Sequence, residues 1–278
     1  MTRWNTVAVY GVGLIGGSVG MAVKERKLAE RVVGIGRNAD RLANAVRLNA
    51  IDEFVTDVAD SPVPDLVVLC APVQRLPDHC AAIAKHFPDA LITDAGSTKL
   101  RLIEKIEAEC PQANFVGSHP MAGSERSGVE YSASDLFQGC TVIITPTQTS
   151  KPESAEIVTG FWKELGANTV TMTPEEHDRA LAIASHVPHV ISSALAAETP
   201  ENVLPLVAGG WRDTTRIAAA DVEMWTQIML ENNAHVSAWL NGVQSRLSDF
   251  ETALKNNDRE TISRLLTAGK QRRDALGS

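Results

Sequence analysis

The chain has 278 residues, of which 44% are hydrophobic and 22% are charged, and these values exclude collagen-like, low-complexity and wholly disordered proteins. The length allows two domains or one large domain with a sizeable core. Lys and Arg number 26 against 34 Asp and Glu, giving a formal net charge of −8. An acidic surface repels phosphate backbones and anionic lipid, so we expect neither nucleic acid nor a membrane as a partner.

The cysteines show neither the close pairing nor the spacing of a metal site; they are Cys70, Cys80, Cys110 and Cys140. This low density predicts no disulfide framework and favours a cytoplasmic protein. The apolar stretch at 6–23 contains five glycines and lacks the basic start and cleavage pattern of a signal peptide. So many glycines also make it a poor membrane span.

Short β-rich runs alternate with helix-like stretches through the first half of the chain. The runs that predict strands lie at 6–10, 31–35, 65–70, 90–94 and 114–117. Helices are expected after the first strand to about Lys27, and at 74–86 and 99–109. Two further strands, 141–145 and 167–172, flank a helix that begins near Pro152, and we expect the sheet to end there. This alternation predicts a parallel sheet covered by helices.

From Thr173 onward the pattern is helical, because Thr173, Pro174 and the following glutamates form a helix start and apolar residues then recur at helical spacing. The expected helices are 174–198, 201–209, 212–219, 221–253 and 258–273. The predicted fold is therefore an α/β Rossmann-type, mostly parallel sheet domain over 1–172, followed by an all-α dimerisation domain over 173–278. Small helical domains with long apolar faces often bury them against a second copy, so we expect a homodimer.

A glycine-rich motif, Gly11-Val12-Gly13-Leu14-Ile15-Gly16, follows a predicted strand and begins a predicted helix. Gly11 allows a tight turn, Gly13 lets a pyrophosphate approach the backbone, and Gly16 lets helix and strand pack closely. The helix N-terminus supplies aligned N–H donors. This context predicts a dinucleotide-binding site that includes Leu14 and Ile15.

The second predicted strand ends at Gly36 and Arg37, where NAD-binding proteins usually carry an acidic residue for the ribose hydroxyls. The Arg37 guanidinium suits a 2′-phosphate, which favours NADP over NAD. Arg37 is equally compatible with a solvated position, or with stacking on the adenine of either cofactor. Ala71 and Pro72, directly after the strand at 65–70, are further cofactor-binding candidates.

Two polar loops follow predicted strands, TDAGSTK at 93–99 and GSHPMAGSE at 117–125. The carboxyl ends of parallel strands form the ligand-binding edge of an open sheet, so both loops are expected to face the nicotinamide. His119 is the candidate general base, because an imidazole titrates near working pH. Ser97 is a candidate to hydrogen-bond the same substrate hydroxyl. The alternatives are a helix start for Ser97 and a cap or core position for His119.

Three histidines, His177, His186 and His189, occur within thirteen residues, and Pro188 predicts a kink in their helix. No HExxH motif and no neighbouring cysteine accompanies them, so we expect no metal site. Further on, RDTTR at 212–216 offers Arg212 and Arg216, one of which would clamp a substrate carboxylate. The pattern does not choose between them, and an Arg–Asp pair that braces helices is an equally ordinary use.

The motifs GVGLIGGS, TDAGSTK, GSHPMAGSE, EEHDRALAIASHVPH and RDTTRIA stand in the order of a known family. From residue 7 to about 225 the chain resembles the prephenate and arogenate dehydrogenases of tyrosine biosynthesis. The resemblance implies that His119 is the catalytic base and that Ser97 orients it and the substrate hydroxyl. It also implies a substrate-binding set: Ser124, Glu125, His177, His189 and Arg216.

The implied reaction is the oxidative decarboxylation of prephenate to 4-hydroxyphenylpyruvate, with hydride transfer from ring C4 to NADP or NAD. The alternatives within the family are an arogenate dehydrogenase, which forms tyrosine, and a dual-specificity cyclohexadienyl dehydrogenase. The pocket is expected to concentrate His and Arg for an anionic substrate despite the acidic surface. The chain has no length for a fused chorismate mutase or ACT domain, so we expect the monofunctional form.

Two rival interpretations share the predicted architecture. A β-hydroxyacid dehydrogenase or imine reductase combines the same two domains, but hydroxyacid members use a lysine early in the second domain. No lysine occurs here between Lys163 and Lys255, which counts against that chemistry. A regulator that senses NADP without turnover is the other alternative, and it would not need the site set of Ser97, His119, His189 and Arg216.

Overall fold

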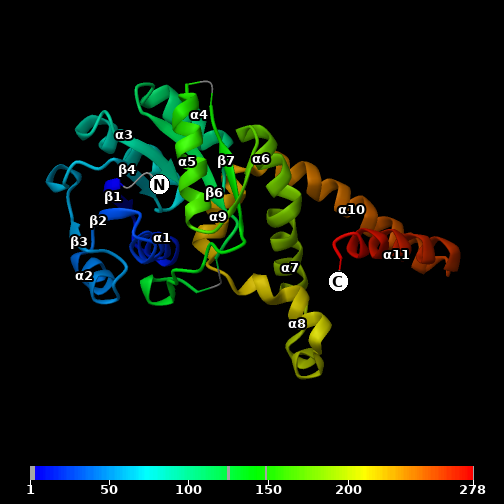
Figure 1. Cartoon of the computed structure of the whole chain (residues 1–278). Coiled ribbons are helices and arrows are strands. Elements are labelled where there is room, and N and C mark those ends of the chain that lie inside the picture. Colours follow the sequence, from blue (N-terminus) through cyan, green and yellow to red (C-terminus); the bar gives the residue numbers. More distant parts are fainter. Residues whose placement is uncertain (1–3, 124–125, 148, 278) are drawn as a thin grey trace. The chain divides into compact units, whose positions relative to one another are not determined.

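The structure is a computed structural model of the chain, and it describes residues 4–123, 126–147 and 149–277 (Figure 1). The chain divides into two compact units, Met1–Asn232 and Asn233–Ser278. Each unit is described by itself.

The first unit is built on an eight-stranded sheet with strand order β3-β2-β1-β4-β5-β6-β7-β8. The strands are β1 (Trp4–Tyr10), β2 (Ala29–Ile35), β3 (Glu53–Val55), β4 (Leu66–Leu69), β5 (Leu91–Asp94), β6 (Phe115–Pro120), β7 (Thr141–Thr145) and β8 (Asn168–Thr171). All neighbouring pairs are parallel except β6 and β7. The connection between those two strands carries only a short 3₁₀ turn, Val129–Tyr131, and a parallel pairing would need a longer crossover, usually helical. The mostly parallel sheet expected from the sequence is confirmed, and it ends at β8.

Helices cover both faces of the sheet. One face packs against α1 (Leu14–Glu25), α2 (Ala39–Arg47) and α5 (Pro152–Glu164), and the other against α3 (Leu76–His86) and α4 (Leu100–Glu109). In β1, Val7 and Val9 belong to the first core while Ala8 belongs to the second. Successive residues of a strand point to opposite faces, so a strand covered on both sides is apolar at every position.

Two elements of this unit were not among the expected strands and helices. Strand β3 has only three residues, too few to show an alternating pattern, and it exists through its pairing with β2 from Val33↔Glu53 to Ile35↔Val55. Helix α2 starts at an Asn38 cap, whose side chain accepts a hydrogen bond from Arg41 N at 2.9 Å.

The helical run expected at 174–198 is divided into α6 (Pro174–Leu181), a π-helical segment (Ala182–His186) and α7 (Val187–Ala197). Helix α6 opens with a capping box in which Thr173 and Glu176 bond reciprocally. Pro188 has no N–H for the preceding turn, which accounts for the irregular segment before it. By length and composition, the run Pro174–Ala197 is apolar enough to cross a membrane, and 33% of its most apolar window is buried.

The remaining helices of the first unit are shorter than expected. The segment at 201–209 forms a 3₁₀ helix (Glu201–Leu206), and the next forms α8 (Gly209–Thr215) with a 3₁₀ turn (Arg216–Ala219). The single helix expected over 221–253 is wrong, because α9 (Val222–Glu231) ends at Asn232. The Asn232 side chain is buried and donates to Asp178 O at 2.7 Å, which holds the chain end of α9 on α6.

The boundary between compact units therefore falls at 232/233, whereas the sequence places the functional boundary near residue 172. The second unit contains α10 (Asn233–Lys255) and α11 (Arg259–Asp274), which pack on each other as a helical hairpin (Figure 1). Asp258 caps α11 by accepting from Thr261 N at 3.0 Å.

Candidate active site

The glycine loop lies between β1 and α1, beside the end of β4, where the strand order changes direction. Gly11 has φ +93°, and a Cβ there would lie 2.9 Å from the backbone carbonyl carbon of Cys70. A Cβ on Gly16 would lie 2.1 Å from the carbonyl oxygen of Gly11. These contacts explain why two of the three positions must be glycine. They also place Ala71, and with it the start of the Ala71-Pro72 segment, directly against the loop.

Gly13 is different, because no atom lies within 4 Å of a Cβ built on it. It is also the N-cap of α1, and no side chain caps that helix. The free N–H groups of the first turn and the open space above Gly13 fit the pyrophosphate of a dinucleotide. Leu14 and Ile15 are the first two residues of that helix.

Arg37 lies just beyond the end of β2 and is exposed, with Gly36 half-buried before it. Nearby, the rings of Tyr10 and His79 stack with centroids 3.9 Å apart. Burial lowers the pKa of His79, and the positive charge of Arg37 is among the groups that lower it further. A cation and a stacked ring pair thus lie at the strand ends where the adenosine half of a dinucleotide binds in this fold.

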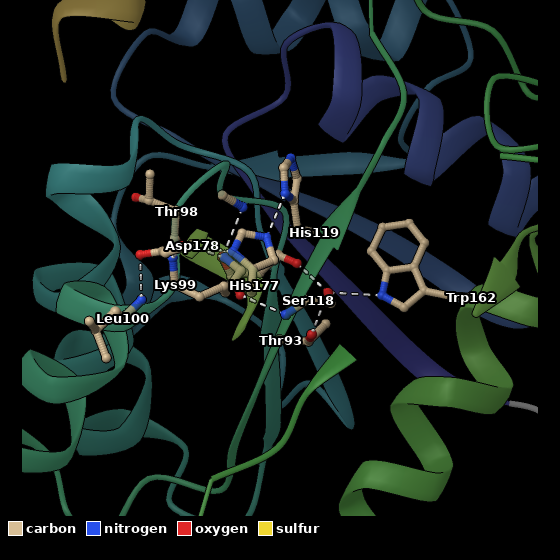
Figure 2. A network of polar contacts seen from close by, with 11 residues as sticks. Thr93, Thr98, Lys99, Leu100, Ser118, His119, Trp162, His177 and Asp178 are labelled. Carbon is tan, nitrogen blue, oxygen red and sulfur yellow. Dashed lines mark hydrogen bonds and ion pairs between the residues drawn. The ribbon is translucent and has the colours of Figure 1, made fainter. Parts of the chain in front are cut away.

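Asp94, the last residue of β5, joins the two polar loops expected at the sheet edge (Figure 2). Its Oδ1 accepts from Ser118 N at 2.9 Å, which fixes the strand that carries His119. Its Oδ2 accepts from Gly96 N at 2.8 Å and from Lys99 Nζ at 2.5 Å. Both Asp94 and Lys99 are fully buried. The ion pair closes the loop 94–99.

His119, near the end of β6, forms a chain with two residues of α6 (Figure 2). His119 Nδ1 lies 2.8 Å from His177 Nε2, and His177 Nδ1 lies 2.7 Å from Asp178 Oδ1. Asp178 also accepts from Lys99 N at 2.9 Å and Leu100 N at 3.0 Å, at the start of α4. The chain therefore runs from the sheet edge through α6 to α4.

His119 is 7% exposed, and its burial holds its pKa well below the ordinary value of 6.5. The positive charges that His177, Lys99 and His186 can carry act in the same direction. At neutral pH the imidazole is thus uncharged, which is the state a general base requires.

A second group of rings surrounds Trp225 on α9. His189 stacks on it with centroids 3.5 Å apart and planes 14° from parallel, and His186 meets it edge-on at 6.0 Å. The His186 ring also lies 3.1 Å from Asn232 Nδ2, and that amide bonds Asp178 O. The two groups of histidines are therefore one connected network.

The other expected site residues are placed as follows. Ser97 is half-buried in the loop between β5 and α4, and its hydroxyl has no protein partner within the described ranges. Arg216 and Arg212 are both exposed, and Arg216 begins the 3₁₀ turn that packs against α7, the helix of His189. Ser124 and Glu125 lie outside the described residues.

The expected substrate-binding residue His177 is fully buried, with both ring nitrogens facing protein atoms. The structure thus places His177 behind His119 and leaves it no ring nitrogen for a ligand. Within the described part of the chain, no group of three or more His, Cys, Asp or Glu side chains is arranged to hold a metal ion.

Sequence reasoning missed several residues of this network: Asp94, Lys99, Asp178, Trp225 and Asn232. A usable signal existed for the first three. Asp94 and Lys99 bracket the same polar loop as Ser97, and Asp178 directly follows His177. Asn232 gave none, because its partner Asp178 is 54 residues away in the sequence.

The geometry around Gly13 and His119 is that of a dinucleotide-dependent oxidoreductase whose base is a buried histidine. Two family models match the chain: the prephenate dehydrogenase nucleotide-binding domain over residues 19–171, and the prephenate dehydrogenase dimerization domain over residues 173–268. The chain belongs to the prephenate dehydrogenase family.

Relatives cover nearly the whole chain. The prephenate dehydrogenase of Bacillus subtilis is 33% identical over 98% of this chain and 76% of its own length. The cyclohexadienyl dehydrogenase of Zymomonas mobilis is 32% identical over 99% and 97%. Among solved structures, the prephenate dehydrogenase of Aquifex aeolicus, in complex with hydroxyphenyl propionate and NAD+, has a TM-score of 0.91 at 32% identity and covers 98% of both chains. The expected family and the use of a nicotinamide dinucleotide are confirmed.

Proposed function

We propose that the chain catalyses the oxidative decarboxylation of prephenate to 4-hydroxyphenylpyruvate, with NAD(P)+ as the hydride acceptor. The observation that carries this proposal is the position of His119. It lies at the ligand-binding edge of a dinucleotide fold, its Nδ1 faces His177 and its Nε2 has no protein partner in the described ranges. A buried, neutral imidazole with one free nitrogen is suited to take a hydroxyl proton.

In the proposed reaction, His119 Nε2 removes the proton of the hydroxyl on ring C4. When bound, the nicotinamide accepts hydride from the same carbon, and C4 becomes part of a carbonyl. The bond between the ring and its carboxylate then breaks, releasing carbon dioxide while its electron pair makes the ring aromatic. Ser97, in the loop closed by the Asp94–Lys99 pair, is proposed to hydrogen-bond the reacting hydroxyl.

The substrate carries two carboxylates, and Arg216 and His189 are the proposed groups that bind them. Arg216 is exposed and can present a bidentate guanidinium, while His189 is held flat against Trp225. Ser124 and Glu125 stay proposed substrate contacts that follow the His119 strand. The orientation these groups impose contributes to rate, since aromatisation supplies the driving force.

The direct test mixes the purified chain with prephenate and NADP+ or NAD+ and follows reduced nicotinamide by absorbance. His119→Asn should lower kcat by about 10²- to 10⁴-fold with little change in KM. Arg216→Ala should chiefly raise KM for prephenate, and an unchanged KM removes Arg216 from carboxylate binding. No reduced cofactor from either prephenate or arogenate would overturn the proposed activity.

Arogenate is the second candidate substrate, because the Zymomonas mobilis relative is named a cyclohexadienyl dehydrogenase and aligns over nearly its whole length. The two substrates differ only in a keto or amino group on the side chain. The ratio of kcat/KM for the two, measured in the same assay, assigns the preference.

We propose NADP as the preferred cofactor, with Arg37 binding the 2′-phosphate. The exposed Arg37 after Gly36, close enough to influence the His79 pKa, supports this assignment. Arg37→Ala should raise the Kd of NADP+ by about tenfold or more while leaving the Kd of NAD+ unchanged. Equal weakening of both cofactors would indicate adenine stacking instead.

We propose a cytoplasmic homodimer whose functional boundary lies near residue 172. The dimerization domain of the family begins at residue 173, and all four cysteines are free. Apolar side chains are exposed on both units after residue 173, among them Ile191, Leu206, Val222, Leu247 and Leu254. Light scattering coupled to size exclusion should give twice the mass of 29.9 kDa.

A further inference from the structure

Asp178 is surrounded by donors. Its Oδ1 accepts from Lys99 N and faces His177 Nδ1, and its Oδ2 accepts from Leu100 N. These are the first backbone N–H groups of α4, where the helix dipole also favours a negative charge. Although burial raises the pKa of Asp178, the hydrogen bonds from His177 and the α4 backbone bring it below its usual value. The carboxylate is therefore ionised and has no proton to donate.

The direction of every hydrogen bond in the chain follows from that charge. Because Asp178 only accepts, His177 must carry its proton on Nδ1, at 2.7 Å. His177 Nε2 then has a lone pair and accepts from His119 Nδ1–H at 2.8 Å. His119 in turn has its lone pair on Nε2, the nitrogen needed for proton removal.

The buried charges favour the same state. Lys99 contributes one positive charge, while Asp94 and Asp178 contribute two negative charges, and all three side chains are at most 1% exposed. The cluster has a net charge of −1 with both histidines neutral. A proton on His119 would bring it to zero, which offsets part of the cost of burying an imidazolium.

We infer that Asp178 and His177 are positioning residues that set the tautomer of His119 and stabilise its protonated form. This inference rests on the proposed function, in which His119 is the base. Neither residue touches the substrate, because both are buried behind the His119 ring. Other titratable or charged groups acting on the histidine pair are Lys99, Asp94 and His186, of which His186 bonds Asn232 on the far side.

A packing role for His177 makes a different prediction from an accepting role. His177→Phe fills the space without an acceptor, whereas His177→Gln can place an amide oxygen near Nε2 and accept from His119. We expect His177→Phe to lower kcat by about 10²- to 10³-fold with KM for prephenate nearly unchanged. His177→Gln should be at least about tenfold faster than His177→Phe.

The matched control is His86, which is exposed at the end of α3. His86→Phe and His86→Gln should leave both kcat and KM at wild-type values. The Kd of NADP+, measured by titration for each His177 variant, should also stay within about threefold of wild type, showing that the cofactor half is intact.

The pH profile is a second, independent readout. In Asp178→Asn the carboxylate no longer stabilises an imidazolium, so the acidic limb of kcat/KM should move to lower pH while the plateau falls by about tenfold or more. A purely structural loss would lower the plateau without moving the limb. Asp178→Asn thus decides the inference even if His177→Phe fails to fold.

Two results would overturn the inference: His177→Phe equal to or faster than His177→Gln, or an acidic limb that stays in place in Asp178→Asn. Both require an active wild-type enzyme with an inactive His119→Asn variant, so they are distinct from failure of the proposed function. That failure would appear as wild-type protein without turnover of either substrate.

Discussion

Lys99 is the buried cation on which the loop 94–99 depends, and its replacement by Met tests this directly. Its side chain is fully buried, and its Nζ lies 2.5 Å from Asp94 Oδ2 and 3.1 Å from Thr98 O. Lys99→Met keeps the length of the side chain but leaves the Asp94 carboxylate buried without its counter-ion. Removing one partner of a buried pair costs about 3–5 kcal/mol, so we expect a loss of that size in the free energy of unfolding.

The second half of the cycle removes the other charge. In Asp94→Asn the remaining amide oxygen can still accept from Gly96 N or Ser118 N, which lie 2.8 and 2.9 Å from the carboxylate oxygens. In the double variant no uncompensated charge is left. We therefore expect it to be more stable than the sum of the two single losses predicts, by about 2 kcal/mol.

The assay is urea unfolding at one fixed protein concentration, followed by tryptophan fluorescence and circular dichroism. Lys105→Met is the matched control, since Lys105 is exposed on the same helix and should change stability by less than about 0.5 kcal/mol. A loss below about 1 kcal/mol in Lys99→Met, or strict additivity in the double variant, would refute the role of Lys99 as the counter-ion of Asp94.

Further predictions concern the glycine loop and a second buried histidine. Gly13→Ala should leave the melting temperature unchanged but weaken NADP+ binding about tenfold or more, because its Cβ has open space that the pyrophosphate needs, whereas Gly16→Ala should lower both, since its Cβ would meet Gly11 O at 2.1 Å. Burial lowers the pKa of His186 to about 4, so the unfolded chain binds a proton below about pH 6.5 that the folded protein resists. The associated stability, about 3 kcal/mol, is complete above pH 6.5 and is lost as the pH falls toward 4, and a melting curve of His186→Leu with an equally steep pH slope would contradict this.

Most of the fold was predictable because it follows local patterns. Fully apolar runs gave seven of the eight strands in order, and the Thr173–Glu176 capping box marked the start of α6. The misses have tertiary causes. Strand β3 is too short to have a pattern of its own, and the break at Asn232 arises because its side chain bonds Asp178, which no local pattern contains.

The site was predictable only as far as strand order carries it. The loops after β5 and β6 were expected to meet, since parallel neighbours end at one edge of the sheet, and Asp94 does bond Ser118 N. The sequence did not reveal that His177 stands behind His119, because that contact spans 58 residues and depends on how α6 packs on α4. A histidine in a motif was therefore taken as a substrate ligand, while its geometry is that of a partner to the base.

The division of charge in this site also differs from a simple basic pocket. The buried cluster around His119 carries Lys99 against two carboxylates, so it favours acceptance of a proton, whereas an anionic substrate needs positive charge. The exposed Arg216 and the His189 ring on Trp225 lie outside that cluster and can supply attraction for carboxylates. Substrate binding and proton removal thus make opposite electrostatic demands, and the fold meets them with separate groups. On the proposed function, variants of Asp178 should change kcat and its pH dependence, while variants of Arg216 should change KM, and a variant of either residue that changed both equally would show that the two groups are not separate.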